Sequence, residues 1–170
     1  GEWSWSNDEG EQLELTVSGP VITVTNTNDS GEGSLRQAVL DAVDGTELNF
    51  ADSVRGKIIL KSQIVITKNV TISGPGVDEI TLSGNNTNRV CVIAPNITTT
   101  IQGLTATEGF ISGELDNDGG AIQISPQAVV TLKDCVVTNS NASDLGGAIY
   151  IAQATMTMNN CTILPFFWFN

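Results

Sequence analysis

The chain has no histidine among its 170 residues. Acid–base catalysis by imidazole and histidine-ligated metal sites are therefore excluded. Basic residues are also scarce, because seven Lys and Arg stand against 19 Asp and Glu, giving a net charge of −12. Phosphate groups bind to basic patches, so this balance argues against nucleic acids and anionic membrane surfaces as partners.

Long apolar runs are missing as well. No stretch approaches the ~18 apolar residues of a membrane span, so we expect no membrane insertion. An initiator Met and a signal-peptide pattern are both absent, which we expect of a mature chain after signal cleavage or of a trimmed one. With 40% hydrophobic residues, the chain suits one domain with a sizeable core.

Cysteines are few and widely spaced. Cys91, Cys135 and Cys161 each lie inside a β-type run, without any CxxC pair. Such thiols behave as small buried hydrophobes, and we predict that they face the core. The alternative is a disulfide between Cys135 and Cys161, which occupy matching repeat positions about 4.8 Å apart in stacked coils.

Short β-type runs fill the chain from Lys57 onward, separated by short breaks rich in Gly, Asn, Asp, Ser and Pro. The segment that starts with GGAI at Gly119 aligns with the one at Gly146, an offset of 146 − 119 = 27, and the matching cysteines are offset by 161 − 135 = 26. A period in the twenties with three short strands per repeat is typical of a solenoid. Residues 56–164 leave room for about four to five coils.

One short helix is predicted ahead of these coils, over residues 34–43. Ser34 lies three residues before Gln37, the spacing of a capping box. Gly45 is placed to stop the helix. A lone helix before a run of strands suits a lid on the open end of the solenoid. Its apolar stripe is made of Leu35, Ala38, Val39 and Ala42.

Four stretches carry a resemblance to a known group. They are VTNTNDSGEGSLRQAVLDA, TISGPG at 71–76, GGAI at 119–122 and GGAIYI at 146–151. Together they resemble secreted bacterial right-handed parallel β-helix proteins of the adhesin, autotransporter-passenger and polymorphic outer-membrane-protein type. The resemblance covers roughly residues 21–164. It implies an extracellular or cell-surface protein of structural or adhesive function, and this group has no shared catalytic motif.

The predicted fold class is thus an all-β solenoid, a right-handed parallel β-helix of about four to five coils with an N-terminal capping α-helix. Four regions follow along the chain: an N-terminal extension at 1–18, the cap at 19–55, the β-helix at 56–164 and an aromatic tail at 165–170.

Aromatic residues gather at both ends of the chain. Near the start, Trp3 and Trp5 alternate with serines, which indicates either an extra strand covering the cap or a strand that docks on another molecule. At the other end, an aromatic cluster either folds back as a C-terminal cap or plugs the next copy of the chain. The second alternative would give a head-to-tail filament. The cluster consists of Phe166, Phe167, Trp168 and Phe169.

Carboxylates supply the candidates for chemistry. Glycoside hydrolysis requires a carboxylate pair, for which Asp116 and Asp118 could combine with Asp134 or Asp144. Asp116 and Asp118 lie in a Gly-flanked stretch that we interpret first as a solvated loop, and the alternative is a calcium site of Asp116, Asp118 and Asp144, with calcium the one cofactor considered. A lyase would need a strong base, and Lys133 is the sole Lys or Arg after residue 100. Since polysaccharide-degrading β-helices are generally much longer, we predict that the chain is not an enzyme.

Two further functions remain open. A carbohydrate-binding module or polysaccharide lyase-like β-helix would use the Thr/Ser/Asn-rich outer face and the loop of Asp116, with surface glycans as partners. An ice-binding surface would need a flat ladder of matched threonines on one face. Thr131 and Thr157, which the repeat aligns, are too few to support it.

Overall fold

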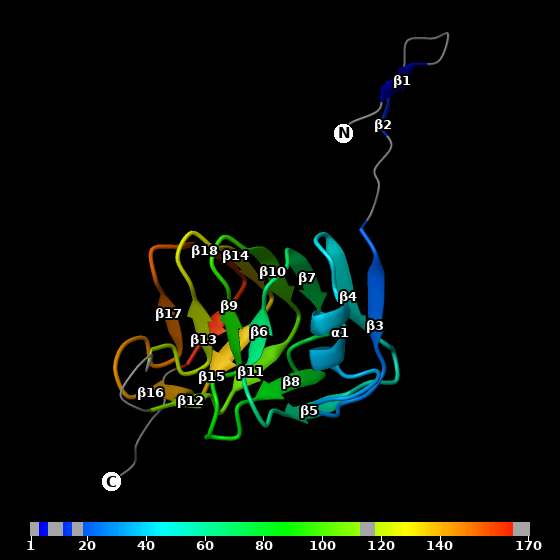
Figure 1. Cartoon of the computed structure of the whole chain (residues 1–170). Coiled ribbons are helices and arrows are strands. Elements are labelled where there is room, and N and C mark those ends of the chain that lie inside the picture. Colours follow the sequence, from blue (N-terminus) through cyan, green and yellow to red (C-terminus); the bar gives the residue numbers. More distant parts are fainter. Residues whose placement is uncertain (1–3, 7–11, 15–18, 113–117, 165–170) are drawn as a thin grey trace.

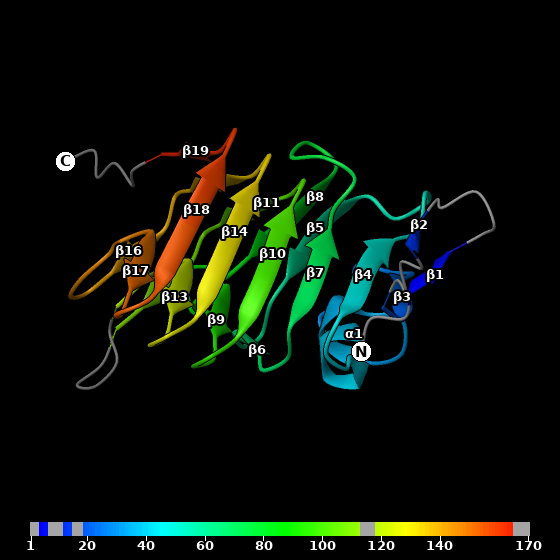
Figure 2. The ribbon, with the colours of Figure 1, turned by 90° about the horizontal axis from the view of Figure 1, so that it is seen from above.

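The structure, a computed structural model, describes residues 4–6, 12–14, 19–112 and 118–164. Its body is a parallel β-solenoid in which the strands of successive coils stack side by side into separate sheets (Figure 1). Figure 2 shows the longest sheet face on, with one strand from each coil. The arrangement is that of a right-handed parallel β-helix of about five turns, as predicted.

Three parallel sheets form the walls of the solenoid. The long sheet, in spatial order, contains β18 (Thr155–Asn159), β14 (Val129–Lys133), β10 (Thr98–Gln102), β7 (Val70–Ser73), β4 (Thr46–Phe50) and β3 (Val21–Val24). The five-stranded sheet contains β19 (Thr162–Ile163), β15 (Val136–Thr138), β11 (Thr105–Thr107), β8 (Ile80–Ser83) and β5 (Gly56–Ile59). The four-stranded sheet contains β17 (Ile149–Ile151), β13 (Ile122–Ile124), β9 (Cys91–Ile93) and β6 (Ile64–Ile66). Two short strands, β12 (Phe110–Ile111) and β16 (Asn141–Ala142), also pair in parallel.

The core is a set of apolar columns that run along the solenoid axis. In the long sheet, Leu48, Ile72, Ile101 and Leu132 follow one another in register, and all four are buried. Polar residues alternate with them and face outward, the period-two pattern of a half-buried strand. The predicted repeat is confirmed, because Ile122 pairs with Ile149 across the two GGAI segments.

The three cysteines are free. Cys91 and Cys135 are buried, in agreement with the prediction of core thiols, and Cys161 is half-buried in the last coil. Burial raises the pKa of the Cys91 thiol to about 12. Cys135 and Cys161 stand at the same position in successive coils, since the residues that follow them, Val136 and Thr162, are paired.

The predicted cap helix exists as α1 (Leu35–Asp41). Ser34 is its N-cap, and its Oγ accepts a hydrogen bond of 3.1 Å from the backbone N–H of Gln37. The second half of the capping box does not form, because the Gln37 side chain donates to Asp41 instead. The apolar stripe faces the core as predicted, with Leu35, Ala38, Val39 and Ala42 all buried.

The helix ends earlier than the predicted residue 43. Ala42 already has extended backbone angles, so the helix stops at Asp41. Gly45, expected to stop the helix, lies farther on with a φ of 84° in the turn before β4. The helix therefore ends before Gly45, which belongs to the turn ahead of β4.

The N-terminal extension contains an antiparallel hairpin of β1 (Ser4–Ser6) and β2 (Gln12–Glu14). Among the described strands these two pair with each other alone, and neither pairs with a strand of the cap, while docking on another molecule, the other alternative, stays a prediction. Trp3 and the side chain of Trp5 lie outside the description, as do Phe166, Phe167, Trp168 and Phe169. Head-to-tail assembly through these aromatics consequently stays a prediction.

The last coil leaves apolar side chains in contact with solvent. Met158 continues the inward column of Leu132, yet it is 48% exposed. Ile151, Ile163 and Leu164 are also exposed at this end. In the described part of the chain, no further strand pairs with β17, β18 or β19 on this side.

Candidate functional site

A groove of about 500 Å³ lies where the long sheet turns into the five-stranded sheet. One wall is formed by residues 74–77 of the connection between β7 and β8, which spans residues 74–79. Polar side chains from the three following coils line the rest: Gln102, Lys133, Asp134, Asn160 and Thr162. We call this feature the corner groove.

The groove exists because its corners differ in length. The connection between β7 and β8 has six residues, whereas residues 103–104, 134–135 and 160–161 make the next three corners. Thr105 Oγ1 donates a 2.8 Å hydrogen bond to the carbonyl of Val77, which fixes the long connection beside the tight ones. Gly103 is required at this point, because its φ is +63° and a Cβ there would lie 2.4 Å from the Gly74 carbonyl oxygen.

Lys133, Asp134 and Asn160 give the groove its polar character. Lys133 is the last residue of β14 and faces outward, in register with Gln102. Asp134 follows in the corner, and Asn160 Nδ2 donates a 2.6 Å hydrogen bond to its Oδ1. This bond orients the Asp134 carboxylate, so the groove is lined by both a cationic side chain and an oriented acceptor.

The other cationic side chains are engaged elsewhere or lie away from the groove. Arg36, Arg55 and Lys57 form ion pairs with Asp29, Glu79 and Glu108. Arg89 is 1% exposed and donates to the carbonyls of Asp118 and Gly119 and to Gln63. Lys61 and Lys68 are exposed and do not line the groove. Lys133 is thus the cation that the corner groove presents to a ligand.

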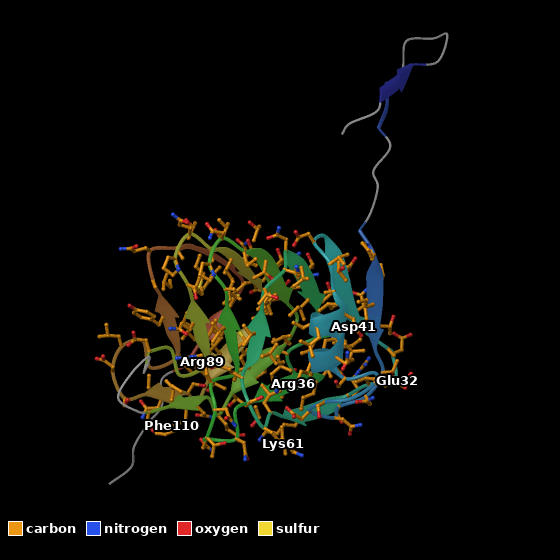
Figure 3. The ribbon with its side chains drawn as sticks, viewed as in Figure 1. Glu32, Arg36, Asp41, Lys61, Arg89 and Phe110 are labelled. Atoms are coloured by element: carbon orange, nitrogen blue, oxygen red, sulfur yellow. The ribbon has the colours of Figure 1, made fainter. Side chains whose placement is uncertain are left out.

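A second charged cluster joins the cap to the first coil. Figure 3 labels two of its members, Arg36 and Lys61, on the side where α1 meets the β-helix. Arg36 donates to the carbonyls of Ser62 and Gln63, at 2.5 and 2.9 Å, and to the carboxylate of Asp29. All of these contacts are intramolecular, so we assign the cluster a structural role.

The pKa of Asp29 reflects the same cluster. Burial by itself would raise this pKa. The hydrogen bonds from Arg36 and from the backbone N–H of Lys61, with the positive charges of both residues, outweigh burial and hold it below its ordinary value. The ionised carboxylate is therefore stabilised in the folded protein.

The predicted carboxylate set is only partly described. Asp116 lies outside the described residues. Asp118 Oδ1 accepts a 2.9 Å hydrogen bond from the backbone N–H of Leu145, which places Asp118 next to the loop of Asp144. Asp134 lies at a different corner, in the groove. Within the described ranges no three acidic or Cys side chains gather as a metal site, so calcium binding stays a prediction.

Sequence reasoning had named Lys133 and Asp134 but not their neighbours in the groove. Gln102, Asn160 and Thr162 were missed as groove residues, although Asn160-Cys161-Thr162 fits the N-glycosylation sequon. A signal was available for Asn160, since the offset of 26 between Cys135 and Cys161 also aligns Asp134 with Asn160.

Comparison with known proteins gives partial relatives. No family profile matches the chain. A protein of Aspergillus terreus named probable pectate lyase C is 49% identical over 70 residues, 39% of this chain and 16% of that protein. Its namesake in Aspergillus fumigatus is 48% identical over 71 residues, with shares of 40% and 16%. The one in Neosartorya fischeri is 49% identical over 70 residues. The match thus spans 16% of these relatives' length.

These relatives correct the prediction that the chain is not an enzyme. Proteins named pectate lyases are enzymes, and the shared stretch is nearly half identical. The prediction rested on the small number of coils and of basic residues. The number of basic residues did not show where they lie in the fold. Lys133, the last Lys or Arg along the chain, lines the corner groove. The resemblance to bacterial surface β-helices stays a prediction.

Proposed function

We propose that this chain forms a polysaccharide lyase-like β-helix that binds and cleaves an acidic polysaccharide of the pectate type. The observation that carries the proposal is the 47–50% identity over about 70 residues to several proteins named probable pectate lyase C. The corner groove, which Lys133 lines, supplies a surface on which such a polymer can lie.

The reaction class sets what the groove must do. A lyase acting on a polymer of sugar acids removes the proton on the carbon next to the carboxylate. The bond to the glycosidic oxygen then breaks, a carbon–carbon double bond forms, and the leaving oxygen takes up a proton. The site must therefore neutralise the sugar carboxylate and provide a base.

Lys133 is the groove residue suited to the carboxylate. Its ammonium group can form a charge-assisted hydrogen bond with the sugar acid. Gln102 and the Thr162 hydroxyl line the groove beside it and can bind sugar hydroxyls. Asp134, which accepts a hydrogen bond from Asn160, is the carboxylate of the groove and would serve as the base that takes the proton from the sugar carbon and returns it to the leaving oxygen.

Overall charge opposes this binding. The chain has a net charge of −12, so it repels a polyanion at a distance while Lys133 attracts a sugar acid at close range. Salt screens the long-range repulsion more than a short contact. We therefore expect binding of pectate to strengthen as salt is raised from low to physiological concentration.

An extracellular location is part of the proposal, because a long polysaccharide is met outside the cell. No helix in the described part of the chain is long and apolar enough to cross a membrane. Localisation in the source organism, by fractionation and immunoblotting, would test it.

The decisive test is incubation of the full chain with polygalacturonate. Release of unsaturated ends, followed by their ultraviolet absorbance, is the expected result. Lys133→Gln should abolish it, whereas Lys68→Gln, which changes an exposed lysine outside the groove, should leave it intact. Retention of the protein in a polygalacturonate gel without cleavage would refute the catalytic half of the proposal. Neither retention nor cleavage would refute all of it.

A further inference from the structure

The outward face of the long sheet carries four threonines at matching positions of consecutive coils, and the same row continues on β4 with Glu47. Thr71, Thr100, Thr131 and Thr157 follow one another in register on β7, β10, β14 and β18. The repeat in the sequence had aligned Thr131 with Thr157 alone. The structure extends this row from two threonines to four. Figure 2 shows the four strands side by side with their outer face uncovered.

A second row runs parallel to the first, two residues earlier on the same strands. It consists of Thr98, Val129 and Thr155, which are paired in register and exposed. Residues two apart on a strand share one face. Valine has the branched shape of threonine, so the two rows form one flat strip of similar side chains. Asn69 closes the second row, since its Oδ1 accepts a hydrogen bond from the backbone N–H of Thr98.

The hydroxyl groups of this strip are available to water. Among the described residues, none of the six strip threonines donates its hydroxyl to a protein acceptor. Other threonines do: inward-facing Thr99 donates to the Val70 carbonyl, and Thr105 on the five-stranded sheet donates to the Val77 carbonyl. The strip hydroxyls must therefore satisfy their hydrogen bonds with solvent.

The β-propensity of threonine does not explain this placement. Propensity alone would spread threonines over all three sheets. The outward row of the four-stranded sheet contains none, being Val65, Val92, Gln123 and Tyr150. On the five-stranded sheet the outward row is Lys57, Thr81, Thr105, Val136 and Thr162, and Thr105 donates its hydroxyl to the Val77 carbonyl. The long sheet is the one that carries threonines at the same outward position of four consecutive coils.

The stacking of coils spaces these groups as a lattice. Neighbouring coils are about 4.8 Å apart, and residues two apart on a strand are separated by about 6.7 Å. Such an array of methyl and hydroxyl groups can hold water molecules in a regular two-dimensional pattern. A surface of this kind matches a crystal, where many weak contacts act together, better than it matches one small ligand.

We propose that the outward face of the long sheet, with the strip of Thr71, Thr98, Thr100, Val129, Thr131, Thr155 and Thr157, binds ice. The threonine methyl groups sit against the crystal and the hydroxyl groups join its water network. This activity is independent of Lys133 and of polysaccharide cleavage, so either proposal can fail without the other.

Ice partitioning of the purified full chain tests the proposal. Ice is grown slowly from a solution of the fluorescently labelled protein, and the fraction taken up by the crystal is measured together with freezing hysteresis. The protein should enter the ice and depress the freezing point below the melting point. Exclusion from the ice, as for an ordinary soluble protein, would overturn the proposal.

Matched variants locate the surface. Thr100→Tyr and Thr131→Tyr place a bulky ring on the strip while keeping a hydroxyl and a good strand former. Thr81→Tyr makes the same change on the outward face of the five-stranded sheet. The strip variants should lose uptake and hysteresis, and the control should keep both. Equal losses in all three would overturn the assignment.

Circular dichroism must show the wild-type fold for each variant. If a tyrosine prevents folding, Thr100→Ser and Thr131→Ser remove the methyl groups alone. They should still lose most of the hysteresis, whereas unchanged hysteresis in a folded double serine variant would overturn the proposal.

Discussion

Asn160 Nδ2 donates a 2.6 Å hydrogen bond to Oδ1 of Asp134, joining the same corner of two successive coils. Both residues have left-handed backbone angles, with φ of 52° and 49°. Asn and Asp tolerate this conformation better than other residues with a side chain. The bond thus fixes a corner of the fold and the carboxylate of the corner groove together.

Asn160→Ala should destabilise the protein more than Asn160→Gly. Alanine loses the hydrogen bond, worth about 1 kcal/mol, and adds about 1–2 kcal/mol of left-handed strain. Glycine loses the bond but adopts the conformation freely. Urea denaturation of the three proteins measures the difference. Equal stability of the two variants would show that backbone strain at this corner is absent.

Acidification should destabilise the junction between the cap and the first coil. The pKa of Asp29 is lowered in the folded protein, so its ionised form contributes stability above the unfolded value of about 4. That contribution is lost as the pH falls through the lower folded pKa. The pKa of Glu108, lowered by hydrogen bonds from Lys57 and Ser83, acts in the same direction.

The measurement is the thermal midpoint between pH 7 and pH 2. Asp29→Asn should be less stable than wild type at pH 7, and the two should converge at low pH. Asp52→Asn, which changes an exposed carboxylate of the polar connection after β4, is the control and should follow the wild-type curve. A constant gap between wild type and Asp29→Asn at every pH would contradict the assignment.

Shortening an inward-facing side chain to alanine should lower the free energy of unfolding less in the last coil than in the coil before it. Leu132 is 1% exposed and Met158, its neighbour in the next coil, is 48% exposed. Leu132→Ala should therefore cost about 2–5 kcal/mol of unfolding free energy, and Met158→Ala under about 1 kcal/mol. Chemical denaturation gives both values. A large loss from Met158→Ala would mean that this side chain is covered in solution.

Much of the fold could be predicted because a solenoid repeats itself. The GGAI segments and the matched cysteines revealed the coil, and Ser34 with the apolar stripe after it revealed the cap helix. The end of the helix was missed because Ala42 looks helical by its spacing although its backbone is extended. Local spacing cannot show where tertiary packing pulls the chain out of a helix.

The surfaces were harder to predict because the coils differ in length. Thr100 pairs with Thr131, whereas the coil between Thr131 and Thr157 is five residues shorter, as the register shows. Insertions at the corners hide this alignment in a single sequence. The corner groove depends on the same irregularity, since it forms where the long connection at 74–79 stands beside tight corners.

The GGAI repeat gives the most direct test of coil stacking. A Cβ on Gly120 would lie 2.2 Å from the carbonyl oxygens of Asn141 and Gly147, both backbone atoms of the adjoining coil. A Cβ on Gly147, the equivalent residue one coil later, would meet its nearest atom at 3.8 Å, and its φ is not left-handed. The same substitution should therefore have opposite effects at the two positions.

Gly120→Ala should destabilise the protein by about 1–3 kcal/mol or more, because the backbone of the next coil must shift. Gly147→Ala should be neutral or should stabilise by up to about 1 kcal/mol, through the lower entropy of the unfolded chain. Thermal and urea denaturation compare the pair. A loss at Gly147 as large as that at Gly120 would show that another layer packs on the last coil in solution, because only such a layer could crowd its Cβ.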